Sequence, residues 1–424
     1  MSVGVVMPDV SKDLDALNLY GVSFSCFLIA SLFANVVSGL WSDRRGYPVP
    51  FLAGVVLFVA GMALAGSADA KEMFLVARAV QGLGAGASIV ALYVMIARVY
   101  PAVVRPKVFA ALSAAWVVPS MVGPAVAGFV GENWGWRFVF YGIIPLVIPA
   151  LIMLVPALRM ASSGGEQAEP GDGPRSRPLP MTLAATSAAA GAGVLLWGVD
   201  EVHKRPAVGV VATLAGLAFL IYGLYRLLPP GALRFGRGLP TTVLLRGFFS
   251  AAFFGVNFFI PLALESVKGF NSQQAGIALT MGALGWSTGS FLQSRRTAEP
   301  YRRIRLGAAC VTVGIAIALF AVLPPVSGWI TVPAWIVAGF GMGLGMTTVS
   351  VTALKQSPVN EQGANSAALS VTDMLGSALT AGLGGAVVNV VGHGPSQIAT
   401  GFVVISVLMA AIALAATLLA PRTR

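Results

Sequence analysis

The sequence predicts an all-α protein that spans a membrane many times. Of its 424 residues, 57% are hydrophobic and only 10% are charged, whereas soluble domains carry about 25% charged residues. The mean hydropathy is +0.83. Apolar runs of about 20 residues, enough to cross about 30 Å of hydrocarbon as a helix, recur along nearly the whole chain. They leave no room for a large soluble domain.

We expect one membrane helix in each of thirteen apolar runs. The runs are Asn18–Trp41, Pro48–Ser67, Glu72–Ala97, Lys107–Val130, Arg137–Ala157, Met181–Val199, Ala207–Leu228, Thr241–Leu264, Gln273–Ser294, Ile304–Leu323, Trp329–Lys355, Gly363–Val391 and Gln397–Ala420. A further apolar stretch, Met1–Pro8, measures about 12 Å as a helix and is too short to cross.

The longest polar interval, 159–180, is rich in Gly, Pro, Ser and Glu and is typical of a flexible linker. It divides the chain into four predicted parts. These are an N-terminal helix bundle (1–158), the linker (159–180), two inserted membrane helices (181–228) and a C-terminal bundle of six helices (241–420).

An internal repeat supports this division. Ala110–Ser113 recurs as Ala367–Ser370 at an offset of 257 residues, which also superposes Gly128 on Gly385. Other correspondences occur at nearby offsets: Pro8 with Pro261, Gly39 with Gly289, and Gly82–Gly86 with Gly341–Gly345. The two six-helix bundles are therefore divergent copies related by a pseudo-twofold axis. Secondary transporters built from such repeats place their site between the halves.

The repeat also bears on the first helix. Thr241 precedes Pro261 by 20 residues, whereas only seven residues precede Pro8. By comparison with the second copy, about 13 residues of the first helix are missing. We therefore expect the first helix to be truncated here and the natural chain to begin upstream of Met1.

The charge distribution predicts an orientation. If the breaks between runs alternate between the two sides, 20 of the 27 basic residues, Arg246 among them, fall on one side, which is then cytoplasmic and carries the C-terminus. The net charge of +11 reflects this topology and contact with anionic lipid rather than nucleic-acid binding. The excess of Arg over Lys, with abundant Ala, Gly and Val, indicates a bacterial protein of the cytoplasmic membrane.

The reactive side chains give no sign of an enzyme. Cys26 and Cys310 are far apart in the sequence, and His203 and His393 are isolated. No spacing suits a metal site, and no grouping suggests nucleophilic catalysis. We expect no cofactor and no metal.

A short polar break carries the first family resemblance. The segment from Gly39 to Gly46, with Asp43 and Arg44 between them, resembles the G-x-x-x-D-R-x-G loop of major facilitator superfamily transporters. The resemblance implies a cytoplasmic latch in which the aspartate and arginine form a charge network. The family's basic residues after the second glycine are replaced here by Tyr47 and Pro48, so we expect part of the latch to be weakened.

Two further motifs are similar to patterns of the same superfamily, the second of them typical of its drug exporters. Arg78 and Gln81 match an R-x-x-Q-G-x-G pattern, in which the arginine is implicated in proton coupling and Gln81 would line the cavity. The alternative is that Arg78 extends to the exterior interface. Gly123, Pro124 and Gly128 resemble the G-P-x-x-G-G pattern of antiporters, which implies a pliable seal between the halves. The following segment, 134–138, is similar to one in the 14-helix drug:proton antiporter family.

Asp373 is the acidic residue placed well inside an apolar run. It lies about 15 Å past Gly363 by helix rise, and the repeat sets it opposite Trp116. One hypothesis makes Asp373 a reversible proton carrier, with Trp116 as an aromatic cavity wall. The other makes it a structural carboxyl that bonds to Thr372, Ser377 or a neighbouring helix.

Asn257 is a further cavity candidate, because the first helix of each half lines the cavity in the family. The cluster Phe248–Phe259 suits either lipid contact and packing or a binding wall, and the sequence does not decide between them.

These features predict a monomeric, proton-coupled transporter that exports small amphipathic compounds or drugs by alternating access. Its partners would be the substrate, protons and the lipid bilayer. One alternative is a proton-coupled or facilitated importer of a metabolite. Another is a membrane sensor or scaffold that no longer transports; retained efflux by the chain would argue against it.

Overall fold

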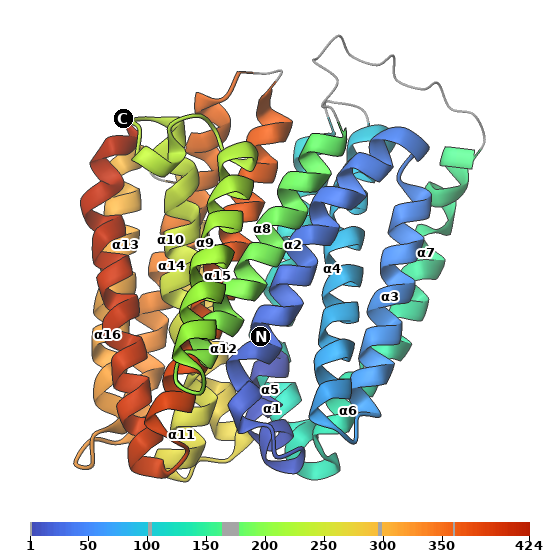
Figure 1. The fold of residues 1–424 in the computed structure, drawn as a ribbon. Coiled ribbons are helices and arrows are strands. Elements are labelled where there is room, and N and C mark those ends of the chain that lie inside the picture. The colour runs from blue at the N-terminus through green and yellow to red at the C-terminus, as the bar shows by residue number, and fades with distance from the viewer. Residues whose placement is uncertain (1, 101–103, 163–177, 296–298, 359–360) are drawn as a thin grey trace.

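The computed structural model describes residues 2–100, 104–162, 178–295, 299–358 and 361–424, and within these ranges all regular structure is helical. Figure 1 shows two bundles side by side, with a helical hairpin in front of them. We call the side on which the last helix ends the C-terminal side, and the opposite side, where α6 and α11 lie, the far side.

The helices follow one another in the order that the sequence predicts. The N-terminal bundle contains α1 (Ser2–Asp13), η1 (Leu17–Leu19), α2 (Tyr20–Arg45), α3 (Pro48–Gly66), α4 (Lys71–Val99), α5 (Arg105–Trp134), α6 (Trp136–Tyr141) and α7 (Ile144–Ser162). The inserted hairpin consists of α8 (Pro178–Glu201) and α9 (Pro206–Leu227). After η2 (Ala232–Arg234), the C-terminal bundle contains α10 (Leu239–Asn257), α11 (Ile260–Lys268), α12 (Ser272–Arg295), α13 (Pro300–Leu319), η3 (Phe320–Val322), η4 (Gly328–Ile330), α14 (Thr331–Gln356), α15 (Gln362–Val391), α16 (Pro395–Leu419) and η6 (Ala420–Thr423).

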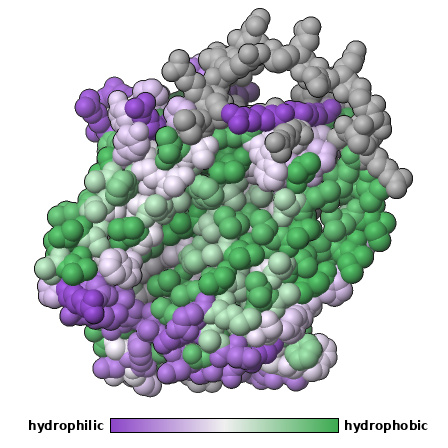
Figure 2. Space-filling model, turned by 45° about the vertical axis from the view of Figure 1, so that its right-hand side comes forward, coloured by the Kyte–Doolittle hydropathy of each residue, from purple (hydrophilic) through white to green (hydrophobic). Residues whose placement is uncertain are grey.

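Each of the thirteen predicted runs is helical. In the described part of the chain, eleven spans are long and apolar enough to cross a membrane. The remaining two runs lie in α5 and α12, which are 30 and 24 residues long. Figure 2 shows an apolar belt with hydrophilic residues above and below it, as expected of a protein surrounded by lipid.

Two runs are each divided into two helices by a proline. Pro261 lacks an N–H group, and its ring would collide with the carbonyl of Asn257, so α10 ends there and α11 begins at Ile260. Pro145 acts in the same way on Tyr141, which separates α6 from α7. Gly135, between α5 and α6, has a φ of +92°, a conformation that favours glycine.

The glycine runs show how the repeat is built. Gly82 and Gly86 bring α4 into backbone contact with α2, and Gly84 brings it against α3. In the second copy, Gly339 and Gly343 face α12 and Gly341 faces α13. Gly82 therefore corresponds to Gly339, at the same offset of 257 residues as the Ala-Ala-Leu-Ser repeat. The pairing of Gly82–Gly86 with Gly341–Gly345 that the sequence suggests is therefore wrong by two residues.

The inserted hairpin lies beside the junction of the two bundles, because α8 packs against both α2 and α15. The side chain of Leu196 lies against Gly382, and the Asn389 amide donates to Asp200 at 2.7 Å. The predicted linker shortens at both ends, since α7 continues to Ser162 and α8 begins at Pro178. The rest of the linker lies outside the described residues.

Candidate functional site between the bundles

Backbone contacts join the two bundles in the far half of the molecule. A Cβ atom on Gly21 of α2 would lie 2.6 Å from the Cα of Gly385 on α15, so only glycine permits this crossing. The Tyr20 hydroxyl donates to the carbonyl of Phe258 at 2.8 Å, and the Ser25 hydroxyl donates to that of Ala378 at 2.8 Å. The far half is therefore sealed in this conformation.

The segment that contains Gly123, Pro124 and Gly128 lies at a second junction between the two bundles. A Cβ on Gly128 would lie 2.8 Å from the Cα of Gln273, and one on Gly276 would lie 2.7 Å from the carbonyl of Pro124. The structure thus places Pro124 and Gly128 of α5 in close contact with α12, and Gly123 lies one position before Pro124. Small residues let two helix backbones approach in this way.

Asp373 is paired inside the C-terminal bundle. Its Oδ2 accepts hydrogen bonds from Nη2 and Nε of Arg246, at 2.9 and 3.2 Å. Its Oδ1 accepts from the hydroxyl of Ser250. Arg246 also donates from Nη1 to the Ser350 hydroxyl at 2.5 Å. This cluster ties α10 to both α14 and α15.

The Arg246–Asp373 pair is only partly enclosed. The two side chains keep 24% and 26% of their surface accessible. Tyr93 of α4, in the other bundle, lies within electrostatic range of both charges. The pair therefore faces the space between the bundles. The Ser377 hydroxyl bonds to the backbone carbonyl of Asp373, whereas the carboxylate accepts hydrogen bonds from Arg246 and Ser250 of the neighbouring helix α10.

Arg78 is buried in the N-terminal bundle, with only 5% of its surface accessible. Its guanidinium donates to Gln81 Oε1 and, at 3.4 Å, to the carbonyl of Ser23, and it lies over the Phe27 ring at 4.5 Å. Gln81 in turn contacts Met62 Sδ. Within the described residues, these contacts of Arg78 are all with neutral groups. Because it is buried, Arg78 does not extend to the exterior interface.

Asn257 is also buried, and its Oδ1 accepts a hydrogen bond from the Trp335 indole at 2.9 Å. Asn257 therefore holds Trp335, which is one end of a row of contacting aromatic rings that we call the aromatic wall. Ring contacts run from the N-terminal bundle into the C-terminal bundle, in the order Tyr20, Phe24, Phe258, Phe254, Trp286, Phe253 and Trp335.

One face of α10 combines the charged pair with this wall. Arg246, Ser250 and Phe254 are spaced by four residues and so lie along one side of the helix, and Phe258 follows just past its end. Phe254 and Phe258 are partly accessible, whereas Phe249, Phe253 and Phe259 are buried. The structure thus separates the Phe248–Phe259 cluster into packing residues and residues that line the junction.

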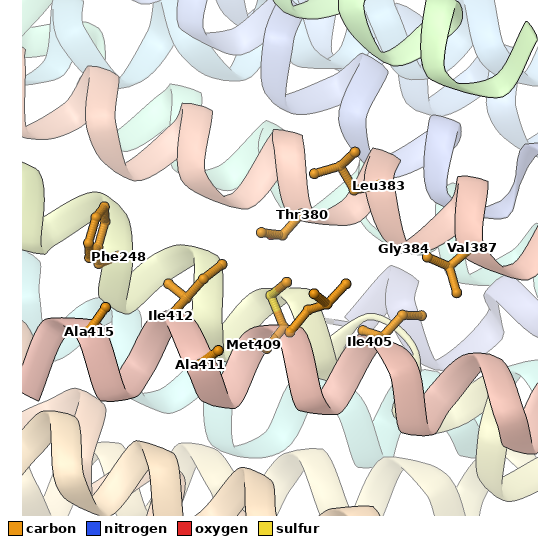
Figure 3. A pocket seen from close by; sticks show the side chains of 11 residues that line it. Phe248, Thr380, Leu383, Gly384, Val387, Ile405, Met409, Ala411, Ile412 and Ala415 are labelled. Atoms are coloured by element: carbon orange, nitrogen blue, oxygen red, sulfur yellow. The ribbon is translucent and has the colours of Figure 1, made fainter. Parts of the chain in front are cut away.

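An apolar groove of about 420 Å³ lies elsewhere, between α10, α15 and α16 (Figure 3). Phe248, Leu383, Met409 and Ile412 are among its lining side chains, and Thr380 is the polar one. It contains no charged group, so it offers shape and apolar contact but no proton chemistry.

The latch loop is very short, since α2 ends at Arg45 and α3 begins at Pro48. Gly46 adopts a φ of +81°, which explains the glycine there. Arg44 is exposed, and a Cβ on Gly39 would meet Val90 at an ordinary 3.6 Å. Arg98 of α4 donates to the Ser42 carbonyl at 3.3 Å. The side chains of Asp43 and Trp116 lie outside the described residues.

The segment after α5 fixes the far end of α1. The Asp13 carboxylate accepts from Arg137 Nη1 at 2.6 Å and from the Trp136 indole at 3.0 Å. The hydrogen bond from Arg137, followed by that from Trp136, lowers the pKa of Asp13 below its ordinary value of 3.8. Arg137 also donates to the Ala68 carbonyl at 3.1 Å, which ties α1 to the turn before α4.

This contact predicts a small pH-dependent stabilisation. A carboxyl whose pKa is lowered on folding stabilises the fold above its unfolded pKa, and the contribution is lost as the pH falls through its folded pKa. Asp13→Asn should therefore lower stability by about 0.5 kcal/mol at pH 7, a small value because the pair is exposed. Unfolding temperatures measured from pH 7 to pH 3 should converge for the two proteins. A difference that stays constant over this range would contradict the assignment.

Sequence reasoning missed two charged residues. The orientation argument groups Arg246 with the basic residues of the cytoplasmic breaks, although Arg246 lies within the predicted run Thr241–Leu264. A cation inside an apolar run is itself a signal of a functional residue. Glu265 directly follows that run, but α11 continues to Lys268, and only 4% of the Glu265 side chain is accessible. Among the described residues, no group of three or more His, Cys, Asp or Glu could hold a metal ion.

Several known proteins with similar sequences are named as multidrug transporters. "Multidrug resistance protein 3" of Bacillus subtilis is 21% identical over 359 residues, which cover 83% of this chain and 69% of that protein. A "Probable multidrug-efflux transporter" of Mycobacterium tuberculosis is 23% identical over 416 residues, which cover 96% of this chain and 88% of that protein. The match to "Multidrug transporter protein MdtP" of B. subtilis, at 23% identity, covers 66% of this chain and about half (51%) of that protein.

Solved structures share the fold. A peptide transporter of the POT family in complex with sulfate superposes with a TM-score of 0.68 at 15% identity, covering 100% of this chain and 91% of that one. A D-xylose-proton symporter superposes with a TM-score of 0.62 at 16% identity, covering 96% of this chain and 92% of that one. The Major Facilitator Superfamily model matches residues 1–381. With its two bundles of repeated helices, the chain therefore belongs to the major facilitator superfamily, a family of membrane transporters.

Proposed function

We propose that this transporter exports small amphipathic compounds in exchange for protons, by alternating exposure of a site between its bundles. The observation that carries the proposal is the Arg246–Asp373–Ser250 cluster, which lies within membrane helices and remains partly accessible. Ionisable groups at such depth are costly and mark proton or substrate paths. The relatives named as multidrug transporters support a small-molecule substrate.

Asp373 would carry the proton. When ionised, it accepts both hydrogen bonds from Arg246 and so ties α10 to α15. A proton on Asp373 removes the charge that holds the guanidinium, so the hydrogen bonds from Arg246 to Asp373 weaken, whereas the bond from Arg246 to Ser350 remains. Proton binding would therefore loosen α10 from α15, the helix that crosses α2 at the junction of the bundles.

The substrate would lie against the aromatic wall. Phe254 and Phe258 continue the face of α10 that carries Arg246, and they offer an apolar surface next to a charged pair. Such a surface suits a compound with one apolar and one polar part. Arg78 and Gln81 would supply polar groups from the N-terminal bundle, and Arg78 would contribute to proton coupling through its buried charge.

The latch loop would control the alternating access of the site. Gly39, Asp43, Arg44 and Gly46 would form a latch on the C-terminal side, which the excess of basic residues makes cytoplasmic. The chain would act as a monomer in a bacterial cytoplasmic membrane. A difference of one pH unit supplies about 1.4 kcal/mol per proton, and 100 mV adds about 2.3 kcal/mol per net charge moved.

A transport assay with a matched control tests the proposal. Inverted membrane vesicles containing the full chain should take up a cationic dye when their interior is acidified, and Asp373→Asn should abolish this uptake. Asp200→Asn provides the control, because it is the same change at a carboxylate that is also 26% accessible. Full gradient-driven uptake by Asp373→Asn would remove the carrier role. Absence of uptake for every compound in a drug panel would overturn the export proposal.

A further inference from the structure

A second set of ionisable groups joins the two bundles on the far side. Asp9 and Lys12 belong to α1, Glu265 to α11, and Ser272 begins α12. The Ser272 oxygen lies 2.7 Å from Asp9 Oδ2 and 3.2 Å from Glu265 Oε1. Lys12 Nζ lies 3.7 Å from Glu265 Oε2. One hydroxyl thus lies between carboxyl groups from opposite halves of the transporter.

The number of protons decides what this arrangement means. A serine hydroxyl has one proton, so it donates to one carboxylate and can only accept from the other. If both carboxyls were ionised, one of the two short oxygen contacts would be repulsive. A single proton on the second carboxyl turns that contact into a hydrogen bond. The geometry points to one proton shared by Asp9 and Glu265 when the far side is sealed.

The neighbouring charged groups do not compensate for a second negative charge at this pair. Lys12 is the cation in contact with Glu265, but 65% of its side chain is accessible, and solvent weakens its charge. The other ionisable groups nearby have partners of their own: Lys268 with the carbonyls of Leu323 and Val326, Asp13 with Arg137, Glu132 with Asn271, and the Tyr20 hydroxyl with the Phe258 carbonyl. α16 and η3, which also pack on α11, contain no ionisable residue.

The pair exists only while the bundles meet on the far side. Opening that side separates α1 from α11 and α12, and each carboxyl then reaches water and ionises independently. Protonation therefore favours the sealed far side. Release of one proton on opening changes the ratio of sealed to open molecules tenfold per pH unit, between the pKa values of the two states. The inference rests on the alternating access of the proposed function, but not on its substrate or direction.

A distance measurement tests this switch without any transport. Spin labels on Ala70→Cys and Pro325→Cys, which are exposed on the far side of opposite bundles, report its opening. The native cysteines are first replaced in Cys26→Ala and Cys310→Ala. In lipid nanodiscs of the full chain, the short-distance population should grow as the pH falls from 9 to 5. Glu265→Gln should keep the short distance throughout, because the amide imitates the protonated carboxyl.

Controls separate the pair from other titrating groups. Glu132→Gln removes a carboxylate that bonds across the same junction, to Asn271 at 2.9 Å, and it should keep the wild-type pH response. Asp9→Asn should flatten the response as Glu265→Gln does, so the test stands even if one variant fails to fold. A wild-type distance that ignores pH, or an unchanged response in both variants, would overturn the inference. Failure of dye uptake together with a pH-dependent distance would instead count against the export proposal alone.

Discussion

Arg246→Met should destabilise the protein by about 1–3 kcal/mol. The change leaves Asp373 with Ser250 but without the two guanidinium hydrogen bonds, in a position where water reaches only part of the carboxylate. Loss of one partner from a fully buried ion pair costs about 3–5 kcal/mol, and the partial accessibility here lowers that figure. Unfolding temperature in detergent micelles is the measurement.

A double-mutant cycle makes this test specific. Arg246→Met combined with Asp373→Asn leaves no unpaired charge, so the double variant should be more stable than the sum of the single effects predicts. The pair Arg302–Glu299, at 3.6 Å and with side chains 70% and 60% accessible, serves as control. Arg302→Met should have almost no effect, since exposed pairs contribute little. Strict additivity in the Arg246 cycle would show that the two residues are not coupled.

Gly84→Ala should have the largest effect on folding. The added Cβ would overlap the backbone nitrogen of Phe58 and lie 2.6 Å from the carbonyl oxygen of Gly54, so α3 and α4 would have to separate. Overpacking typically costs about 1–3 kcal/mol, and we expect a loss of at least about 3 kcal/mol here because the neighbours are backbone atoms rather than flexible side chains. The yield of monodisperse protein in detergent and its unfolding temperature should both fall sharply.

The matched control is Gly193→Ala in α8, where a Cβ would meet nothing within 4 Å. The substitution is the same and also lies in the interior of a membrane helix. It should be neutral or slightly stabilising, because alanine is favoured over glycine in helices by about 1 kcal/mol. Equal losses at Gly84 and Gly193 would mean that helix propensity, rather than the contact with α3, determines the outcome.

The sequence by itself determined the helices and their division into two repeated bundles with an inserted hairpin. Apolar runs of membrane length can satisfy their backbone groups in lipid only as helices, so composition and run length settle this level. The Ala-Ala-Leu-Ser repeat even contained the correct offset of 257 residues. The breaks at Pro145 and Pro261 were also open to prediction, because proline cannot donate the helical hydrogen bond.

Only the tertiary structure decided which polar groups meet. Asp373 was found from the sequence because it stands alone in an apolar run, but its partner Arg246 lies 127 residues away on α10. Likewise, Asp9 and Ser272 are separated by 263 residues and belong to opposite bundles. Helical periodicity fixes which face of its own helix a residue occupies, whereas a contact between helices depends on their rotation and relative height. Those are set by backbone packing at glycines such as Gly21 and Gly385, which the sequence shows only as small residues.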